Sequence, residues 1–268
     1  MVQPCRSISS SSLVGAPEKI TEDELGSSPT DLAEVGVSAD LAQRLEAGGI
    51  RELFPVQAAT YKAAIEGRDL LVRSKTGSGK TLGFAIPAIQ LLEEERAGPP
   101  RRGRGPGCVV MAPTRELAKQ VSEEFELYCG QLRTLCVYGG VSYVPQQEAL
   151  RRGVDIVVGT PGRMIDLMER NHLRLDETRV FVLDEADEML RMGFKEPVEE
   201  VMKQLPPPGK RSTMLWSATV PSWVRQLASQ YLENHISVDL VGDDAAKLPD
   251  TITHHVVLCD RGQRSQAC

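Results

Sequence analysis

The stretch Ser74-Lys75-Thr76-Gly77-Ser78-Gly79-Lys80-Thr81 decides how this chain folds. An apolar run at residues 69–73 favours a buried strand before it, and residues 82–92 after it have the apolar spacing of a helix. A strand, a glycine-rich loop and a helix in this order form the context of a phosphate-binding loop. We therefore expect all eight residues of the stretch to bind a nucleotide.

The residue types in this loop suit a nucleotide that carries a metal ion. Gly77 and Gly79 allow successive backbone N–H groups to point at one anion. Lys80 can reach the outer phosphates, and the Thr81 hydroxyl can bind Mg²⁺. The alternative is a Gly/Ser turn with a solvated lysine, and the strict pattern has glycine where this chain has Ser74. Motifs later in the chain decide between the two interpretations.

Composition restricts the class of protein. The chain has 268 residues, enough for one large α/β domain with tails. Hydrophobic residues make up 41% and charged residues 25%, as in soluble globular proteins, and no apolar run is long enough to cross a membrane. The net charge of −6 excludes a global basic field, so any RNA contact must come from local patches. The 6 cysteines form no CxxC pair, which favours a reducing compartment and no zinc site.

Apolar strands alternate with helical patterns through the middle of the chain. Beyond residues 69–73, strands are expected at residues 108–112, 132–138, 155–159, 179–183, 213–216 and 236–240. This pattern predicts an α/β fold with a mostly parallel sheet of about seven strands and helices on both faces. Ligands of such sheets bind at the carboxyl ends of the strands, where the phosphate-binding loop and four further segments would share one rim. The four are Pro113-Thr114-Arg115, Thr160-Pro161-Gly162-Arg163, Asp184-Glu185 and Ser217-Ala218-Thr219.

Two carboxylates follow the strand predicted at residues 179–183. Asp184 can hold Mg²⁺ against phosphates that Lys80 and Thr81 bind. Glu185 can orient and deprotonate an attacking water molecule. The alternative is an acidic helix start that complements the helix dipole. The phosphate-binding loop upstream and the Ser-Ala-Thr segment after the next strand favour the metal and water roles.

The N-terminal part has a different composition. Residues 1–30 are rich in Ser, Gly, Pro and acidic residues without an apolar period, and we expect them to be disordered. Residues 6–14 faintly resemble a transit peptide, and a plain flexible tail is the other interpretation. Ser38 is a candidate N-cap of a first helix, and Pro55 suits the first turn of a second helix that carries Gln57. Residues 98–107 predict a mobile loop.

Taken in order, these segments resemble the motifs of the DEAD-box RNA helicases. The similar segments are residues 74–81 (motif I), 113–118 (Ia), Gly139-Gly140 (GG), 160–163 (Ib), 184–187 (II) and 217–219 (III). Gln57 falls where the Q motif places its adenine-reading glutamine, and Leu32 and Ile50 stand where the family usually has phenylalanines. The form Leu53-Phe54-Pro55-Val56-Gln57 looks most like the Gu-type nucleolar helicases and their plant plastid and mitochondrial relatives. The resemblance therefore implies a nucleolar, nuclear or organellar location.

The resemblance also implies a domain organisation. A tail at residues 1–30 would precede a Q-motif region at residues 31–57 and an ATP-binding RecA-like domain at residues 58–242. Residues 243–268 would be a linker and the truncated start of a second RecA-like domain that this chain lacks. Such a domain, acting in trans, is an expected partner together with RNA, and no membrane partner is expected.

The implied activity is ATP hydrolysis coupled to RNA remodelling, with ATP and Mg²⁺ as cofactors. Lys80, Asp184 and Glu185 would be catalytic, with Thr81 and Asp184 on the metal, and Ser217 and Thr219 would couple ATP to RNA. The implied RNA-contacting residues are Pro113, Thr114, Arg115, Gly140, Thr160, Pro161, Gly162 and Arg163, of which Arg163 would hold either the motif Ib loop or RNA.

The isolated chain is expected to be nearly inactive, because the family completes its ATP site with arginines of the second domain. The alternative function is that of a non-catalytic one-domain protein that binds nucleotide or RNA. A small-molecule P-loop kinase is disfavoured by the Ser-Ala-Thr segment and by residues 113–118.

Overall fold

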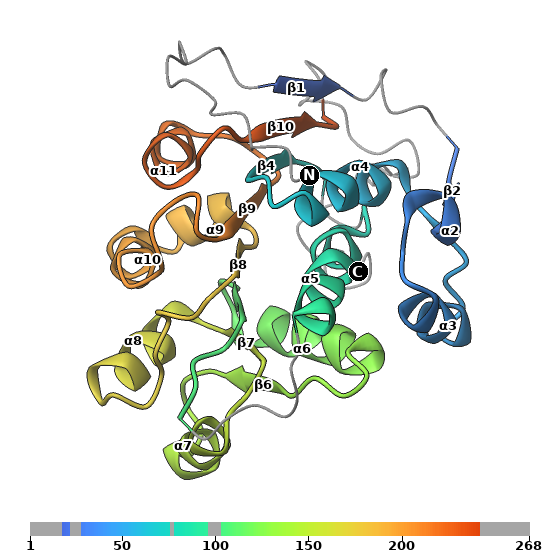
Figure 1. The fold of residues 1–268 in the computed structure, drawn as a ribbon. Coiled ribbons are helices and arrows are strands. Elements are labelled where there is room, and N and C mark those ends of the chain that lie inside the picture. The colour runs from blue at the N-terminus through green and yellow to red at the C-terminus, as the bar shows by residue number, and fades with distance from the viewer. Residues whose placement is uncertain (1–17, 22–27, 76–77, 96–102, 242–268) are drawn as a thin grey trace, which may run out of the picture.

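A computed structural model describes residues 18–21, 28–75, 78–95 and 103–241 (Figure 1). Its centre is an eight-stranded sheet in the order β1-β10-β4-β9-β8-β5-β7-β6, in which every pair of neighbours is parallel. The strands are β1 (Glu18–Thr21), β4 (Leu70–Arg73), β5 (Cys108–Met111), β6 (Thr134–Val137), β7 (Ile156–Gly159), β8 (Val180–Leu183), β9 (Ser212–Ser217) and β10 (Ile236–Asp239). A separate antiparallel pair joins β2 (Thr30–Asp31) to β3 (Glu52–Leu53).

The strand β1 corrects one prediction and adds to another. The sheet has eight strands rather than about seven, and Glu18–Thr21 lies in the segment that we expected to be disordered. β1 pairs with β10, whose residues follow it by more than two hundred positions in the chain. Its residues, Glu-Lys-Ile-Thr, include one apolar side chain, Ile20, which packs against the core. A strand held mainly by backbone pairing to a distant partner leaves no periodic pattern in its own sequence. Residues 1–17 and the linker expected after residue 242 lie outside the described residues.

Helices cover both faces of the sheet, as predicted (Figure 1). α4 (Pro55–Ile65), α5 (Lys80–Glu94) and α6 (Arg115–Tyr128) pack on one face, with α2 (Leu32–Val35) and α3 (Ala39–Ala47) beyond them. The other face is covered by α8 (Pro161–Glu169), α9 (Ala186–Arg191), α10 (Lys195–Met202) and α11 (Ser222–Tyr231), while α7 (Tyr143–Arg152) lies beside the edge strand β6. No helix within these described ranges is long and apolar enough to span a bilayer.

The expected helix starts are present, with one difference in how they are capped. The side chain of Thr114 accepts a hydrogen bond from the Leu117 N–H and so caps α6. Ser38 stands at the N-cap of α3, but its side chain makes no capping bond. Its backbone N–H instead donates to the Gln90 side chain at 2.9 Å, which ties the start of α3 to α5.

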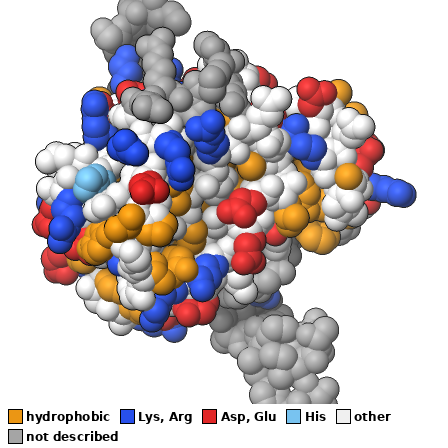
Figure 2. Space-filling view, turned by 90° about the horizontal axis from the view of Figure 1, so that it is seen from below, with side chains coloured by type: hydrophobic (Ala, Val, Ile, Leu, Met, Phe, Trp, Pro, Cys, Tyr) orange, Lys and Arg blue, Asp and Glu red, His pale blue; other side chains and the backbone are white. Residues whose placement is uncertain are grey.

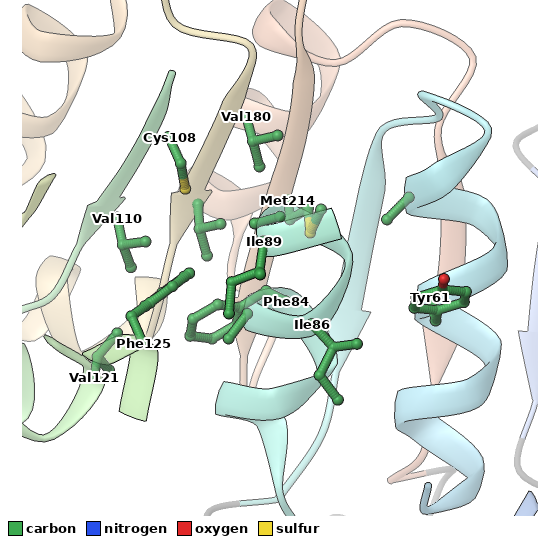
Figure 3. Packing of buried hydrophobic residues seen from close by; sticks show 14 of the residues in the cluster. Tyr61, Phe84, Ile86, Ile89, Cys108, Val110, Val121, Phe125, Val180 and Met214 are labelled. Atoms are coloured by element: carbon green, nitrogen blue, oxygen red, sulfur yellow. The ribbon is translucent and has the colours of Figure 1, made fainter. Parts of the chain in front are cut away.

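Aromatic packing holds the helix of the phosphate-binding loop against the sheet (Figure 3). The ring of Phe84 on α5 lies 6.3 Å from that of Phe125 and 5.7 Å from the edge-on ring of Trp216 on β9. A Cβ atom at Gly83 would lie 2.7 Å from the Trp216 ring, so a glycine is needed for this close approach. α5 is thereby fixed relative to β9, the strand that leads into the Ser-Ala-Thr segment.

Candidate functional site

The polar segments predicted to share a rim do lie at one edge of the sheet. Arg73, the last residue of β4, pairs with Ser217, and Met111, the last residue of β5, pairs with both Leu183 and Gly159. Because the strands are parallel and their last residues are in register, the loops that follow them emerge side by side. These are the phosphate-binding loop and residues 113–115, 160–163, 184–185 and 217–219.

The phosphate-binding loop connects β4 to α5. Gly79 is the N-cap of α5 and has a left-handed backbone, with φ of 77°. Ser74 is buried, its N–H donates to the Ser217 carbonyl at 3.0 Å, and its hydroxyl is hydrogen-bonded to that of Ser78. This loop is therefore joined directly to the Ser-Ala-Thr segment. Lys75 is exposed and Thr81 is half-buried at the start of α5, whereas Thr76 and Gly77 lie outside the described residues.

Lys80 has the surroundings of a residue that binds an anion. Its side chain is buried, and among the described residues its ammonium nitrogen has no hydrogen-bond partner. A buried ammonium group without partners is costly, and phosphate oxygens would supply acceptors of the opposite charge. It lies at the N-terminus of α5, where the helix dipole also favours an anion.

Asp184 has the surroundings of a residue that binds a cation. Its side chain is buried directly after β8, and one of its oxygens accepts a hydrogen bond from the Glu185 N–H at 2.9 Å. Burial raises the pKa of Asp184 to about 6, with a further contribution from Glu185, although the nearby Lys80 ammonium favours the charged form. The charged carboxylate is therefore poorly compensated, and a divalent cation would stabilise it. Lys80 and Asp184 together fit a metal-bound nucleotide.

Glu185 has a strained backbone. Three non-glycine residues of the described ranges have positive φ, namely Asn171, Glu185 and Asn234. Asparagine tolerates this region, whereas a glutamate with φ of 50° pays a conformational cost. Residues held in such conformations concentrate at functional sites, where the surrounding structure enforces a required side-chain position. Here that position is the N-cap of α9, one residue after Asp184.

Gln57 contacts the phosphate-binding loop at Gly79. Its amide oxygen accepts from the Phe54 N–H at 2.8 Å, and its amide nitrogen donates to the Gly79 carbonyl at 2.9 Å. A Cβ atom at Gly79 would lie 2.5 Å from that nitrogen, so the contact also requires glycine. Reading a base would require Gln57 to exchange these two hydrogen bonds for the edge of the base.

Asp187 links the acidic segment to the Ser-Ala-Thr segment, a role that the sequence analysis did not assign. It accepts hydrogen bonds from the Thr219 N–H at 3.0 Å and the Thr219 hydroxyl at 2.8 Å, and its own N–H donates to the Ser217 hydroxyl at 3.1 Å. Burial alone would raise the pKa of Asp187, but the hydrogen bonds with Thr219 and Ser217 outweigh it and lower the pKa below its usual value. Both expected coupling residues thus hold the same ionised carboxylate.

The loops expected to contact RNA meet at the β5 and β7 side of the rim. A Cβ atom at Gly140 would lie 2.8 Å from the Arg115 guanidinium, which places this side chain against the glycine pair. Of the expected RNA-contacting residues, Arg115, Gly140 and Gly162 are exposed, Thr114 and Thr160 are half-buried, and Pro113, Pro161 and Arg163 are buried. The exposed residues can reach a phosphate chain directly, while a contact by the buried ones stays a prediction.

The buried side chain of Arg163 contacts the segment that follows Gly139-Gly140. Its guanidinium donates to the Gln146 side chain and to the Val141 carbonyl, each at 3.0 Å, and stacks 4.0 Å from the centre of the Tyr143 ring. The two expected roles of Arg163 were to hold the motif Ib loop or to hold RNA. Its side chain contacts Val141 after β6 and the start of α7, and a contact with RNA stays a prediction. Sequence reasoning could not decide this, because the partners lie 17 to 22 residues away.

The surface on the α7 side of the molecule carries mixed charge. Figure 2 looks at this side and shows several Lys and Arg side chains across the upper part of the view, with acidic and hydrophobic side chains beside and below them. The exposed hydrophobic residues include Val141 and Val144. A surface of mixed charge agrees with the net charge of −6 of the whole chain.

Comparisons with known proteins agree with this geometry. Residues 54–227 match the DEAD/DEAH box helicase family. The chain is 52% identical over 227 residues to the DEAD-box ATP-dependent RNA helicase 3A, chloroplastic, of Zea mays, covering 84% of this chain and 30% of that protein. It is 47% identical over 229 residues to the DEAD-box ATP-dependent RNA helicase 9, mitochondrial, of Arabidopsis thaliana, covering 85% of this chain and 37% of that protein.

A solved structure supports the fold. The crystal structure of a DEAD box protein from the hyperthermophile Methanococcus jannaschii superposes with a TM-score of 0.70 at 32% identity, covering 79% of this chain and 56% of that one. The α/β fold with a mostly parallel sheet is therefore confirmed as RecA-like of the DEAD-box type. The chain spans about a third of the length of the curated relatives named above.

Proposed function

This chain belongs to the DEAD/DEAH box helicase family, and on that premise we propose that it binds ATP with Mg²⁺ and supplies the ATP-binding part of an ATP-dependent RNA helicase. The observation that carries the proposal is the pair formed by Lys80 and Asp184. One is a buried ammonium without a partner among the described residues, and the other is a buried carboxylate with a raised pKa. A nucleotide with its metal ion would compensate both charges in one binding event.

Residues of this chain would have separate roles in ATP hydrolysis. The loop backbone and Lys80 would hold the β- and γ-phosphates, and Thr81 and Asp184 would hold Mg²⁺. When bound, Mg²⁺ would neutralise charge that develops on the phosphate oxygens. Glu185, fixed in its strained conformation, would orient a water molecule and accept its proton.

The contacts between segments suggest how ATP and RNA would be coupled. Ser74 of the phosphate-binding loop contacts Ser217 through the backbone, and Ser217 and Thr219 contact Asp187. A movement of the loop on nucleotide binding would therefore reach the Ser-Ala-Thr segment through direct hydrogen bonds. The RNA would lie on the exposed parts of residues 113–115, 139–140 and 160–163, through phosphate contacts that carry no sequence information.

A second RecA-like domain is the partner that would complete this site. The curated relatives are about three times as long as the matched region, which leaves room for such a domain in them. The named relatives from a chloroplast and a mitochondrion also support an organellar location for this protein. A fluorescent fusion that accumulates only in the nucleus would contradict that location.

The pH dependence of MgATP binding tests the metal role of Asp184. Because its pKa is raised to about 6, the carboxylate is charged above pH 6 and takes up a proton below it. A proton and a cation compete for the same oxygens, so we expect MgATP affinity to fall by up to about tenfold per pH unit below 6.

Calorimetry between pH 5 and pH 8 would measure this dependence, in steps of about half a unit. Because ATP itself titrates in this range, the matched control is Asp184→Asn in the same buffers. The variant should bind MgATP weakly, with only the pH dependence that ATP contributes. Identical pH profiles for the two proteins would exclude Asp184 from the metal site.

The base-reading role of Gln57 has its own test. A side-chain amide offers one donor and one acceptor, which match the amino group and the ring nitrogen at one edge of adenine. We expect Gln57→Ala to weaken ATP by about tenfold and GTP by much less, since one lost pair of hydrogen bonds is worth about 1–3 kcal/mol. Competition binding with both nucleotides would measure the ratio. Equal losses would show that Gln57 supports only the Gly79 carbonyl that it contacts here.

A further inference from the structure

A row of polar side chains lies on the α11 face of the sheet, near the edge strand β1. Leu71 on β4 packs into the core cluster that includes residues of α11, which identifies this face. Side chains two residues apart in a strand share a face, so Arg73 lies on it too. The register places Ser237 opposite Leu71 and Asp239 opposite Arg73, and it places Lys19 of β1 opposite Ser237. Figure 1 shows α11 beside β10, with β1 beyond β10 at the edge of the sheet.

A pocket of about 460 Å³ lies between this row and the start of α11. Its other wall includes Val220, which directly follows Thr219 of the Ser-Ala-Thr segment, and Arg225 on α11. The Arg225 guanidinium donates to the Val220 carbonyl at 2.6 Å. The helix α5, which begins with Lys80, packs on the other face of the sheet. The pocket is therefore separate from the candidate ATP site but adjoins the segment expected to couple ATP to RNA.

The charges that line the pocket favour an anion. Lys19, Arg73 and Arg225 line it together with one carboxylate, Asp239, which leaves a net charge of +2. The Asp239 carboxylate lies 3.5 Å from the Lys19 ammonium and 3.4 Å from the Arg73 guanidinium, so its own charge is compensated. In the described part of the chain, the hydrogen bond to Val220 is the one polar contact of the Arg225 side chain, and the first turn of α11 has no acidic residue.

Two other pockets of the described chain lack this excess of positive charge. The pocket beside residues 171–174 has three arginines and Glu148 in its lining. Two of these arginines already form ion pairs with Asp155 and Asp176, which lie outside that lining, and Glu148 offsets the third. The pocket beside residues 176–179 is lined by four carboxylates and three cations. The pocket at α11 is therefore the one of the three that suits an anion.

We propose that the pocket at α11 binds the phosphate group of a small molecule, at a site that does not depend on nucleotide binding by Lys80. The guanidinium groups of Arg73 and Arg225 can each donate several N–H groups to phosphate oxygens. Lys19 adds a third cation, and the Ser237 hydroxyl adds a further donor. A phosphate monoester carries a charge of about −1.5 to −2 at neutral pH, which matches the charge of the pocket.

The position of the pocket favours a small molecule over the backbone of RNA as the source of this phosphate. The loops expected to contact RNA follow β5, β7 and β6, at the opposite end of the strand order from β1 and β10. A phosphate bound in the pocket would contact side chains from β1, β4 and α11 at once. It would thereby fix the start of α11, and with it Val220, relative to the sheet.

Inorganic phosphate is the probe for this site, and backbone amide resonances of the isotope-labelled 268-residue chain separate it from the phosphate-binding loop. At constant ionic strength, we expect phosphate to shift the amides of Val220 and Ser237. Arg225→Ala should weaken the affinity measured at these two amides by about tenfold. The affinity measured at Gly79 and Lys80 should not change. Arg225→Lys keeps the charge and should retain most of the affinity.

The controls address folding and general charge. Arg225 is exposed on a helix, where alanine is favourable, so Arg225→Ala should fold normally. Arg191→Ala removes an exposed arginine of α9 outside the pocket and should leave phosphate binding unchanged. Wild-type amides of Val220 and Ser237 that do not respond to phosphate, or an unchanged affinity in Arg225→Ala, would overturn the site. Single-stranded RNA should leave both amides unshifted, and a shift that Arg225→Ala removes would instead assign the pocket to the RNA backbone.

Discussion

Replacing Lys80 with alanine is expected to abolish measurable ATP binding. The ammonium is buried at the start of α5, and its nitrogen has no acceptor within the described part of the chain. Charge-assisted hydrogen bonds to phosphate are among the strongest polar contacts, and losing them would cost about 3 kcal/mol or more, roughly a hundredfold in affinity. The loss would also remove the positive charge that favours ionised Asp184.

The same loop offers a matched control for Lys80→Ala. Lys75 has the same charge, but its side chain is exposed. Its expected contribution to nucleotide binding comes from the backbone of the loop, so Lys75→Ala should reduce ATP affinity only slightly. Calorimetric titration of both variants with MgATP would separate a specific contact from a general effect of charge. Wild-type affinity in Lys80→Ala, or equal losses in both variants, would contradict the proposed site.

The second large effect concerns turnover. The polypeptide of residues 1–268 is expected to bind ATP and to hydrolyse it about 10³- to 10⁵-fold more slowly than a full-length relative, because arginines that approach the γ-phosphate contribute a factor of that size. The motif arginines of the described chain point elsewhere, since Arg115 lies against Gly140 and Arg163 holds Val141. In the relatives, the part of the chain beyond the matched region can supply such residues.

Phosphate release with and without single-stranded RNA would measure this rate. Adding the remaining part of a full-length relative as a separate polypeptide should restore RNA-stimulated hydrolysis, and Glu185→Gln should then remove it. A clear RNA-stimulated rate from the 268-residue chain alone would refute the prediction. If that rate rose with the square of protein concentration, two copies would be completing each other's site.

The rim of the fold could be predicted because each of its loops follows a strand with a clear apolar pattern. The strands are parallel and their last residues are in register. The loops after them, which carry Ser74, Asp184 and Ser217, therefore lie at the same edge of the sheet. Asp187 is the last residue of the acidic motif at residues 184–187, but its partners Ser217 and Thr219 lie about thirty residues further along the chain. Its role depends on that long-range contact.

Three other features could not be read from local sequence. β1 has one apolar side chain and depends on backbone pairing with β10. Arg163 looks the same in sequence whether it faces solvent or packs on Tyr143. Phe54 is a hydrophobic residue at the N-cap of α4, and only its exposure beside Gly79 distinguishes it from a core residue. In each case the role depends on the tertiary structure, either through a contact with a distant residue or through exposure of the side chain.

The pairing of β1 with β10 sets the order in which the sheet can be completed during protein synthesis. Residue 18 pairs with residue 236, a separation of 218 residues. At a translation rate of about 5–20 residues per second, β1 leaves the ribosome roughly 10 to 40 s before its partner is made. The strands β5, β6, β7 and β8 pair over much shorter separations and can assemble first. The first strand of the described residues is thus added to the sheet last, when β10 arrives beside β4.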